Sequence, residues 1–269
     1  MLAGLAAAVA GAGLPPVVFI PEVDSTNDEA LSLASSGVPE FTAVLADVQH
    51  AGRGRRGRSW SSPPGAGMYL SVIVREDGLG ANVPLVTLAA GVAVAEAVAD
   101  VGGLTVELKW PNDVVIGRPW KKLAGILCEA SALGSGSGFM VVGIGVNVQR
   151  AVYPPDVADR ATALDAECDR PVALADLVVA SLRRVRENVA HLRAGRRSDV
   201  LDRWRQFGHA ALDEQPVQWN DDRGVCRGIA YGLSDTGALL VRTVEPAMEF
   251  PRLEQLTAGD VRWETLSRG

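Results

Sequence analysis

The chain has 269 residues, which at about 150 residues per domain is enough for one medium domain and a small one. Hydrophobic residues make up 48% of the chain and charged residues 22%, so the composition excludes a disordered protein. The 26 lysines and arginines are outnumbered by 32 aspartates and glutamates, and a formal net charge of -6 argues against a protein whose whole surface binds nucleic acid. Positive charge that acts on a ligand must therefore be local.

The cysteines and histidines indicate neither a disulfide framework nor a zinc site. Cys128, Cys168 and Cys226 are odd in number, far apart and never in a C-x-x-C pair, and the histidines have no partner at ligand spacing. The apolar residues 1–14 have no lysine or arginine at their start and are fewer than the roughly 20 that span a bilayer. We therefore expect a protein of a reducing compartment, the cytoplasm, with no membrane partner.

Apolar periodicity predicts a first domain that mixes strands and helices. A helix is expected to begin at Thr26, which has capping-box spacing with Glu29, and to end before Gly37. Residues 84–101 are apolar on nearly every side and precede two glycines, as in a buried helix. A Gly/Ser tract at residues 134–138 separates the last two of the predicted strands, which cover residues 17–20, 44–48, 69–75, 104–110, 123–130 and 139–148.

The second half of the chain changes character. Residues 174–189 follow the 3.6-residue period of an amphipathic helix, and Ser198 is placed to cap another helix that ends near residue 207. Short strands separated by turn sequences follow, which suggests a small β-barrel. We therefore predict an α+β fold in which helices cover a mixed sheet, with domains at residues 1–212 and 213–269.

The most unusual segment is Gly-Arg-Gly-Arg-Arg-Gly-Arg at residues 52–58. Four arginines in seven residues concentrate positive charge where glycines let the backbone approach a ligand, a combination that suits a phosphate. The run matches G-x-G-x-x-G, but Ser-Ser-Pro-Pro at residues 61–64 follows instead of a helix, so a dinucleotide fold is not expected. Charge repulsion predicts a loop that stays mobile until an anion orders it. Trp60 beyond it is either a core aromatic or a platform for a nucleobase.

The motif Lys-Trp-Pro-Asn-Asp at residues 109–113 comes where a predicted strand stops. The proline ends strand pairing, which leaves Lys109, Asn112 and Asp113 at an edge where polar groups converge on a ligand. Lys109 suits a phosphate and Asp113 suits Mg²⁺, although Asn-Asp after a proline is also an ordinary turn sequence.

Two apolar strands carry further polar groups. Lys122 opens a strand of small residues, where its ammonium is placed to meet a carboxylate or an α-phosphate. In Gly-Ile-Gly-Val-Asn at residues 143–147, the two glycines expose the backbone to close approach, and Asn147 offers the donor and the acceptor that an adenine edge needs.

Taken in order, these motifs closely resemble those of the bacterial biotin protein ligases. The matching strings are DSTN at residues 24–27, Gln49 with the arginine-glycine loop and Trp60, KWPND at 109–113, KLAGIL at 122–127 and GIGVNV at 143–148. Each string is modest alone, but five in the same order are specific. The resemblance implies a class II aminoacyl-tRNA synthetase-like catalytic domain with a small C-terminal SH3-like β-barrel. It also implies an ATP-dependent ligase that forms biotinyl-5′-AMP, releases pyrophosphate and transfers biotin to a lysine of a carboxylase's biotin carboxyl carrier domain.

The resemblance also assigns roles to single residues. The biotin site would be lined by Ser25, Thr26, Asn27, Gln49, Arg53, Gly54, Arg55 and Lys122. The nucleotide half would use Arg58, Trp60, Lys109, Asn112 and Asn147, and Mg²⁺ would lie near Asp113. Lys122 is the first candidate for catalysis, ahead of Arg55, Asp113 and Lys109, because its ammonium can orient the biotin carboxylate and then offset charge on the phosphoryl oxygens.

Two features depart from the longer family pattern. About 23 residues precede Asp24, too few for the helix-turn-helix of members that repress biotin genes, so we expect a monofunctional ligase that binds no nucleic acid. Residues 118–120 also lengthen the connection between Asp113 and Lys122.

Two alternatives stay open at this point. A lipoate-type ligase would use related chemistry on another acid, although Gln49 and the arginine-glycine loop favour biotin. A nucleic-acid-binding module would use the arginine run and would show steeply salt-dependent binding, but the net charge and the lack of a helix that reads bases argue against it.

Overall fold

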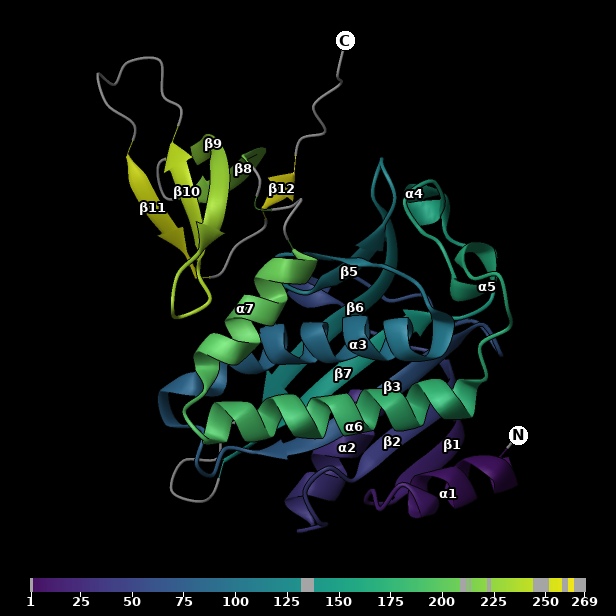
Figure 1. The fold of residues 1–269 in the computed structure, drawn as a ribbon. Coiled ribbons are helices and arrows are strands. Elements are labelled where there is room, and N and C mark those ends of the chain that lie inside the picture. Colours follow the sequence, from purple (N-terminus) through teal and green to yellow (C-terminus); the bar gives the residue numbers. More distant parts are fainter. Residues whose placement is uncertain are drawn as a thin grey trace.

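A computed structural model describes residues 2–131, 138–208, 212, 214–221, 224–243, 252–257 and 261–263 (Figure 1). The larger of its two sheets has seven strands in the order β1-β2-β3-β7-β6-β5-β4. Among these strands β1 and β2 pair in parallel and the other neighbours pair antiparallel, so the sheet is mixed, as predicted. The strands are β1 (Val17–Val23), β2 (Ala43–Gln49), β3 (Gly67–Arg75), β4 (Glu107–Lys109), β5 (Asp113–Ile116), β6 (Lys121–Ala130) and β7 (Phe139–Asn147).

Helices cover both faces of this sheet. The long helices α3 (Val86–Gly102) and α6 (Leu174–Arg193) lie side by side on one face, and α2 (Thr26–Ser35) packs on the other against β2, β3 and β7 (Figure 1). The remaining helices are α1 (Leu2–Gly11), α4 (Pro155–Ala158), α5 (Leu164–Glu167), α7 (Arg197–Phe207) and the 3-10 turns η1 (Arg55–Gly57) and η2 (Gly80–Leu85).

The alternation of side chains along β3 separates two parts of the core. Leu70 and Val72 join the large cluster under α3 and α6, whereas Ile73 packs with Ala30 and Ala34 beneath α2. The same alternation places Ser71 on the α2 face, where its hydroxyl meets the first turn of that helix. The N-terminus of α2 is thereby fixed over the middle of the sheet.

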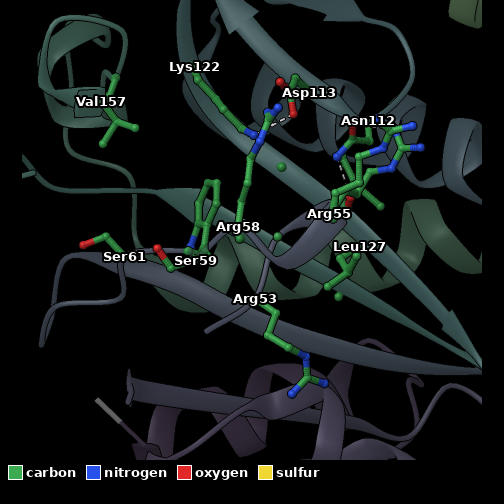
Figure 2. A pocket seen from close by; sticks show the side chains of 18 of the residues that line it. Arg53, Arg55, Arg58, Ser59, Ser61, Asn112, Asp113, Lys122, Leu127 and Val157 are labelled. Atoms are coloured by element: carbon green, nitrogen blue, oxygen red, sulfur yellow. Dashed lines mark hydrogen bonds and ion pairs between the residues drawn. The ribbon is translucent and has the colours of Figure 1, made fainter. Parts of the chain in front are cut away.

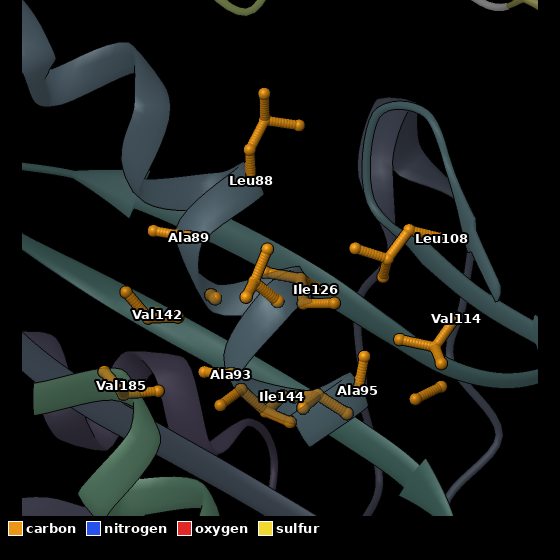
Figure 3. Packing of buried hydrophobic residues seen from close by; sticks show 14 of the residues in the cluster. Leu88, Ala89, Ala93, Ala95, Leu108, Val114, Ile126, Val142, Ile144 and Val185 are labelled. Atoms are coloured by element: carbon orange, nitrogen blue, oxygen red, sulfur yellow. The ribbon is translucent and has the colours of Figure 1, made fainter. Parts of the chain in front are cut away.

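Helix α3 is the central element of the core. Its small side chains, including Ala89 and Ala93, lie against Ile126 and Ile144 of strands β6 and β7 (Figure 3). The helical stretch Gly80–Gly102 is apolar and long enough to cross a membrane by composition, but 67% of its most apolar window is buried inside the fold, which is the burial of a core helix.

The structure corrects two local predictions and adds one strand. The predicted strand 104–110 is shortened to β4. After the turn the chain returns as β5, and Lys109 pairs with Asp113 in a hairpin that was not predicted. Ser198 does not cap α7, because this helix begins at Arg197 and its N-cap position is Arg196, with no side-chain capping hydrogen bond.

The smaller sheet is antiparallel throughout and confirms the predicted β unit after the helices. Its order is β11-β10-β9-β8-β12, from β8 (Gln215–Asp221), β9 (Gly224–Leu233), β10 (Leu239–Thr243), β11 (Leu253–Leu256) and β12 (Arg262–Trp263). The turn between β9 and β10 contacts the end of β4, where Trp110 Nε1 donates a hydrogen bond to Gly237 O at 3.0 Å. Residues 132–137, which include most of the predicted Gly/Ser tract at 134–138, lie outside the described residues. The domain boundary at residue 212 stays a prediction.

Candidate active site

One large pocket opens where the arginine-glycine loop, the larger sheet and the end of the smaller sheet meet. Its volume is about 1040 Å³, at the upper end of the roughly 300–1,000 Å³ of typical ligand sites. Its walls come from the start of α2, residues 53–61, the β4–β5 turn, strands β6 and β7, residues 153–161 and residues 261–263. Every site residue predicted from the sequence lines this pocket.

An uncharged polar wall forms at the N-terminus of α2. Gln49 Oε1 accepts hydrogen bonds from Thr26 N at 2.9 Å and Thr26 Oγ1 at 3.0 Å, and Gln49 Nε2 donates to Ser62 Oγ at 2.9 Å. The predicted capping box is wrong, because the N-cap residue is Ser25, which makes no side-chain capping hydrogen bond. Gln49 instead satisfies a first-turn amide of the helix. This wall offers neutral donors and acceptors to a ligand.

Asn27 is held from two sides in this wall. Its Nδ2 donates to Glu129 Oε2 at 2.6 Å, and its Oδ1 lies 2.6 Å from the Ser71 hydroxyl. The side chain lies directly over Gly143 of β7, where an added Cβ would clash with the Asn27 amide. The close approach that the glycines of this strand predict is thus confirmed, with a side chain of the protein itself as the neighbour.

Arg53 turns toward two carboxylates rather than toward the other cations of its loop. Its Nη1 and Nη2 donate to Asp28 at 2.7 and 2.6 Å, and Nη2 lies 3.0 Å from Glu129 Oε2. These hydrogen bonds hold the pKa of the Asp28 carboxyl below its usual range. Figure 2 shows the Arg53 guanidinium on the far side of the loop from Lys122. Arg53 therefore ties the loop to α2 and β6, and its contact with biotin stays a prediction.

The arginine-glycine loop is a closed turn in the structure. Gly54 N donates to Arg58 O at 2.7 Å, and the turn η1 lies between them. Arg56 within η1 has a φ of 58°, in the left-handed region that favours glycine. The predicted mobility of the loop in the absence of an anion stays a prediction.

Two arginines of this loop reach into the pocket. Arg55 Nη1 donates to Asn112 Oδ1 at 3.4 Å, and Asn112 Nδ2 in turn donates to the backbone carbonyl of Ile126 at 2.9 Å. Arg58 extends toward Lys122 and Asp113 (Figure 2). Residues far apart in the sequence thus bring guanidinium, ammonium, amide and carboxylate groups to one side of the pocket.

Lys122 lies at the centre of this polar group. Its Nζ is 2.6 Å from Asp113 Oδ1 and 5.3 Å from the centroid of the Trp60 ring. The ring covers two glycines of the sheet, because a Cβ on Gly145 would lie 2.5 Å from Trp60 and one on Gly125 would lie 3.1 Å from it. The buried Trp60 Nε1 has no hydrogen-bond partner among the described residues. A ligand acceptor would relieve that unpaired donor.

Lys109 is half-buried in the wall of the pocket. Burial lowers the pKa of its ammonium, and the positive charges of Lys122 and Arg160 lower it further, while Asp113 opposes them. The Lys109 Nζ also lies 5.2 Å from the centroid of the Trp120 ring. An anionic ligand would stabilise the charged form of this lysine.

Asn147 ties down the segment that follows β7. Its Nδ2 donates to Thr162 O at 2.9 Å, while Lys122 N donates to Arg160 O at 2.6 Å and Thr162 N donates to Lys122 O at 3.0 Å. The amide nitrogen of Asn147 is therefore used by the fold, and its contact with adenine stays a prediction.

Comparison with known proteins shows which family this chain belongs to. The biotin/lipoate A/B protein ligase family matches residues 19–147. The biotin–[acetyl-CoA-carboxylase] ligase of Paracoccus denitrificans is 32% identical over 251 residues, which cover 90% of this chain and 100% of that protein. The bifunctional ligase/repressor BirA of Bacillus subtilis is 32% identical over 235 residues, 85% of this chain and 70% of that protein. This chain belongs to the biotin protein ligase family.

The fold of this biotin protein ligase agrees with that assignment. The biotin protein ligase of Aquifex aeolicus, solved in complex with biotin and ATP, superposes with a TM-score of 0.77 at 28% identity. The match covers 93% of this chain and 98% of that one. The predicted fold class, with a catalytic α+β unit and a small β unit, is therefore confirmed.

The ligase pocket also depends on residues that the motifs did not reveal. Ser62 and Ser71 hold Gln49 and Asn27, and Glu129 binds both Asn27 and Arg53. Ser71 alone has a signal in the sequence, as a polar residue between apolar neighbours in β3. Such a residue cannot be paired with its partner until the strand order is known.

The ligase site offers a metal ion one central carboxylate. Asp113 lies beside Lys122, and the described part of the chain contains no group of three or more Asp, Glu, His or Cys side chains that would hold an ion by themselves. Mg²⁺ in nucleotide sites is held by one or two carboxylates together with phosphates. The donor set therefore fits Mg²⁺ that arrives with ATP.

Proposed function

We propose that this ligase condenses biotin with ATP to form biotinyl-5′-AMP and pyrophosphate, and then transfers biotin to a lysine of a biotin carboxyl carrier domain of an acyl-CoA carboxylase. One observation carries the proposal: a neutral polar wall around Thr26 and Gln49 and a group of cations around Lys122 line the same pocket. A neutral wall suits the ureido ring of biotin, and dense positive charge suits the junction of a carboxylate with a phosphate.

In the first step, a carboxylate oxygen of biotin attacks the α-phosphorus of ATP. The new O–P bond forms as the bond to the bridging oxygen breaks, and pyrophosphate leaves with that electron pair. Lys122 orients the carboxylate and offsets the charge that develops on the α-phosphoryl oxygens, with Arg58 beside it and Arg55 adding positive charge from its position at Asn112. No nucleophilic side chain of the protein is needed, because the substrate supplies the nucleophile.

In the second step, the amine of the carrier lysine attacks the carbonyl carbon of the mixed anhydride. The C–N bond forms, the C–O bond to AMP breaks, and the amine proton passes to solvent. The residues that close over the anhydride protect it from water between the two steps.

The nucleotide half of the pocket is assigned to Trp60, Lys109, Asn112 and Asn147, with Arg58 at its border. The Trp60 ring offers a stacking face and an unpaired N–H to the base, and Lys109 offers an ammonium to the phosphates. Asp113 would hold Mg²⁺, which supplies charge neutralisation on the triphosphate when bound. The cytoplasm is the compartment proposed for this reaction.

Mass spectrometry tests the function directly. The purified protein is incubated with biotin, Mg·ATP and a carrier domain, and we expect the mass of one biotin on one lysine of the carrier. Reactions without ATP and with a carrier whose acceptor lysine is replaced by arginine serve as controls. A carrier whose mass is unchanged in the complete reaction would refute the proposal.

A lipoate ligase is the second candidate, because the matching family covers both acids. The relatives named above favour biotin. Isothermal titration with each acid separates the two candidates: biotin binding without lipoate binding supports the proposal, and the reverse result overturns it.

A further inference from the structure

The β5–β6 connection places a tryptophan at the rim of the pocket. Residues 117–120 join the two strands, and the Trp120 side chain is half-buried and lines the pocket together with Lys109. The Lys109 Nζ lies 5.2 Å from the centroid of the Trp120 ring, within the range of a cation–π contact. The β5–β6 connection thus supplies a contact to a predicted nucleotide-binding lysine.

The Trp120 ring is itself held in place by its own hairpin. Arg118 Cζ lies 4.4 Å from the ring centroid, and Arg118 makes two hydrogen bonds of 2.7 Å to the Glu107 carboxylate. Trp120 Nε1 lies 3.4 Å from Glu107 Oε2. Because Glu107 is the first residue of β4, these contacts bind the tip of the β5–β6 connection to the strand that carries Lys109.

The far edge of Trp120 contacts the smaller sheet. The rings of Trp120 and Trp263 are 5.9 Å apart at 84°, an edge-to-face pair. Trp263 belongs to β12, pairs with Val217 of β8 and also lines the pocket. Trp110, which follows Lys109 in the chain, donates a hydrogen bond to the carbonyl of Gly237, in the turn between β9 and β10 of this sheet. The end of β4 is therefore attached to the smaller sheet on two consecutive residues, by Trp110 directly and by Lys109 through Trp120.

We propose that Trp120 is a positioning residue that holds the Lys109 ammonium toward the phosphates of ATP, with Trp263 of the smaller sheet as its support. This inference rests on the proposed function, since it concerns the ATP half of that pocket. Burial and the nearby cations disfavour a charged Lys109 side chain inside the pocket and favour its exposure to solvent. An aromatic face beside the ammonium stabilises the charged side chain inside the pocket. Trp120 acts through Lys109 and need not touch the substrates.

The test measures pyrophosphate release by the full-length protein with ATP and biotin varied in turn. We expect Trp120→Leu to raise the KM for ATP about three- to tenfold, the effect of losing a cation–π contact, and to leave the KM for biotin unchanged. Trp120→Phe keeps an aromatic face and should stay within about twofold of wild type. Lys121→Ala is the control, because it removes a cation next to Trp120 at an exposed position outside the pocket, and it should leave both KM values unchanged.

A double-mutant cycle separates positioning from a structural role. If Trp120 acts through Lys109, Trp120→Leu should have no further effect on the KM for ATP in a Lys109→Ala background. Effects of the two substitutions that multiply, or an ATP KM unchanged by Trp120→Leu, would overturn the inference. If Trp120→Leu loses its thermal unfolding transition, Trp263→Leu tests the same support from the other ring, and an unchanged ATP KM there would also overturn it. A wild-type protein that releases no pyrophosphate would instead refute the proposed function.

Discussion

Lys122 Nζ lies 2.6 Å from Asp113 Oδ1, so the only lysine of the KLAGIL string faces the carboxylate that ends the KWPND string. The two residues come from the antiparallel strands β5 and β6, whose register shifts between Val114 and Val115. Irregularities of this kind re-aim side chains next to functional sites. The pair places the ammonium next to the predicted metal carboxylate, which is also its counter-charge.

We expect Lys122→Ala to lower the rate of adenylate formation by a factor of about 10² to 10³, the usual cost of removing one preorganised charge from a transition state. The fold should persist, since the Lys122 side chain is 35% exposed and does not belong to the core. Pyrophosphate release with saturating biotin and ATP measures the effect. Lys121→Ala, at the exposed neighbouring position, is the control. A Lys122→Ala enzyme with near-normal turnover would remove Lys122 from the mechanism.

We expect Arg55→Gly to loosen the arginine-glycine loop, because it removes the hydrogen bond to Asn112 that anchors this turn across the pocket. The mixed anhydride should then escape and biotinylate unrelated proteins. The measurement is the biotin content of an added bystander protein after incubation with biotin and ATP. Arg56→Gly is the control, since it removes an equal charge where the φ of 58° already suits glycine.

The loop makes a second measurement possible. Protease cleavage within residues 53–58 should slow when biotin and ATP are both present, if ligands order the loop. Cleavage that proceeds at the same rate with and without ligands would count against closure, and bystander labelling equal to wild type would count against the role of Arg55.

The sequence located the pocket well because each motif pairs a special backbone feature with a polar side chain. Pro111 after a strand, the glycines of β7 and the arginine-glycine loop all signal local structure, and each lies at the pocket. Helix α3 was equally predictable from the sequence, since a long apolar segment that ends in two glycines is typical of a buried helix.

The contacts between distant segments were not predictable in this way. Gln49 satisfies the amide of Thr26 because strand β2 ends beside α2, which no local spacing reveals. Arg53 pairs with Asp28 and Glu129 for the same reason, so a residue expected to bind a ligand is engaged by carboxylates of the protein. The sequence shows where the arginines lie along the chain, but it does not show which carboxylates lie next to them in the fold.

Lys109 predicts a pH dependence of ATP binding. Its pKa lies below that of an ordinary lysine, chiefly because of burial, so it loses its charge at a lower pH than an exposed lysine would. Since the charged form attracts phosphate, the KM for ATP should rise as pH increases through that lowered pKa. Lys109→Arg, which stays protonated, should hold its KM for ATP over the same alkaline range. Parallel pH profiles for the two enzymes would contradict a role for Lys109 in binding phosphate.

The two glycines of β7 provide a test that separates the halves of the pocket. A Cβ on Gly145 would lie 2.5 Å from the Trp60 ring, whereas a Cβ on Gly143 would clash with Asn27. Each alanine substitution should lower the free energy of unfolding by about 1–3 kcal/mol through overpacking. We expect Gly145→Ala to raise mainly the KM for ATP and Gly143→Ala to raise mainly the KM for biotin, both measured by pyrophosphate release, with Gly11→Ala at an open position as the control. Equal effects of both substitutions on both substrates would mean that biotin and nucleotide do not divide the pocket along β7 as proposed.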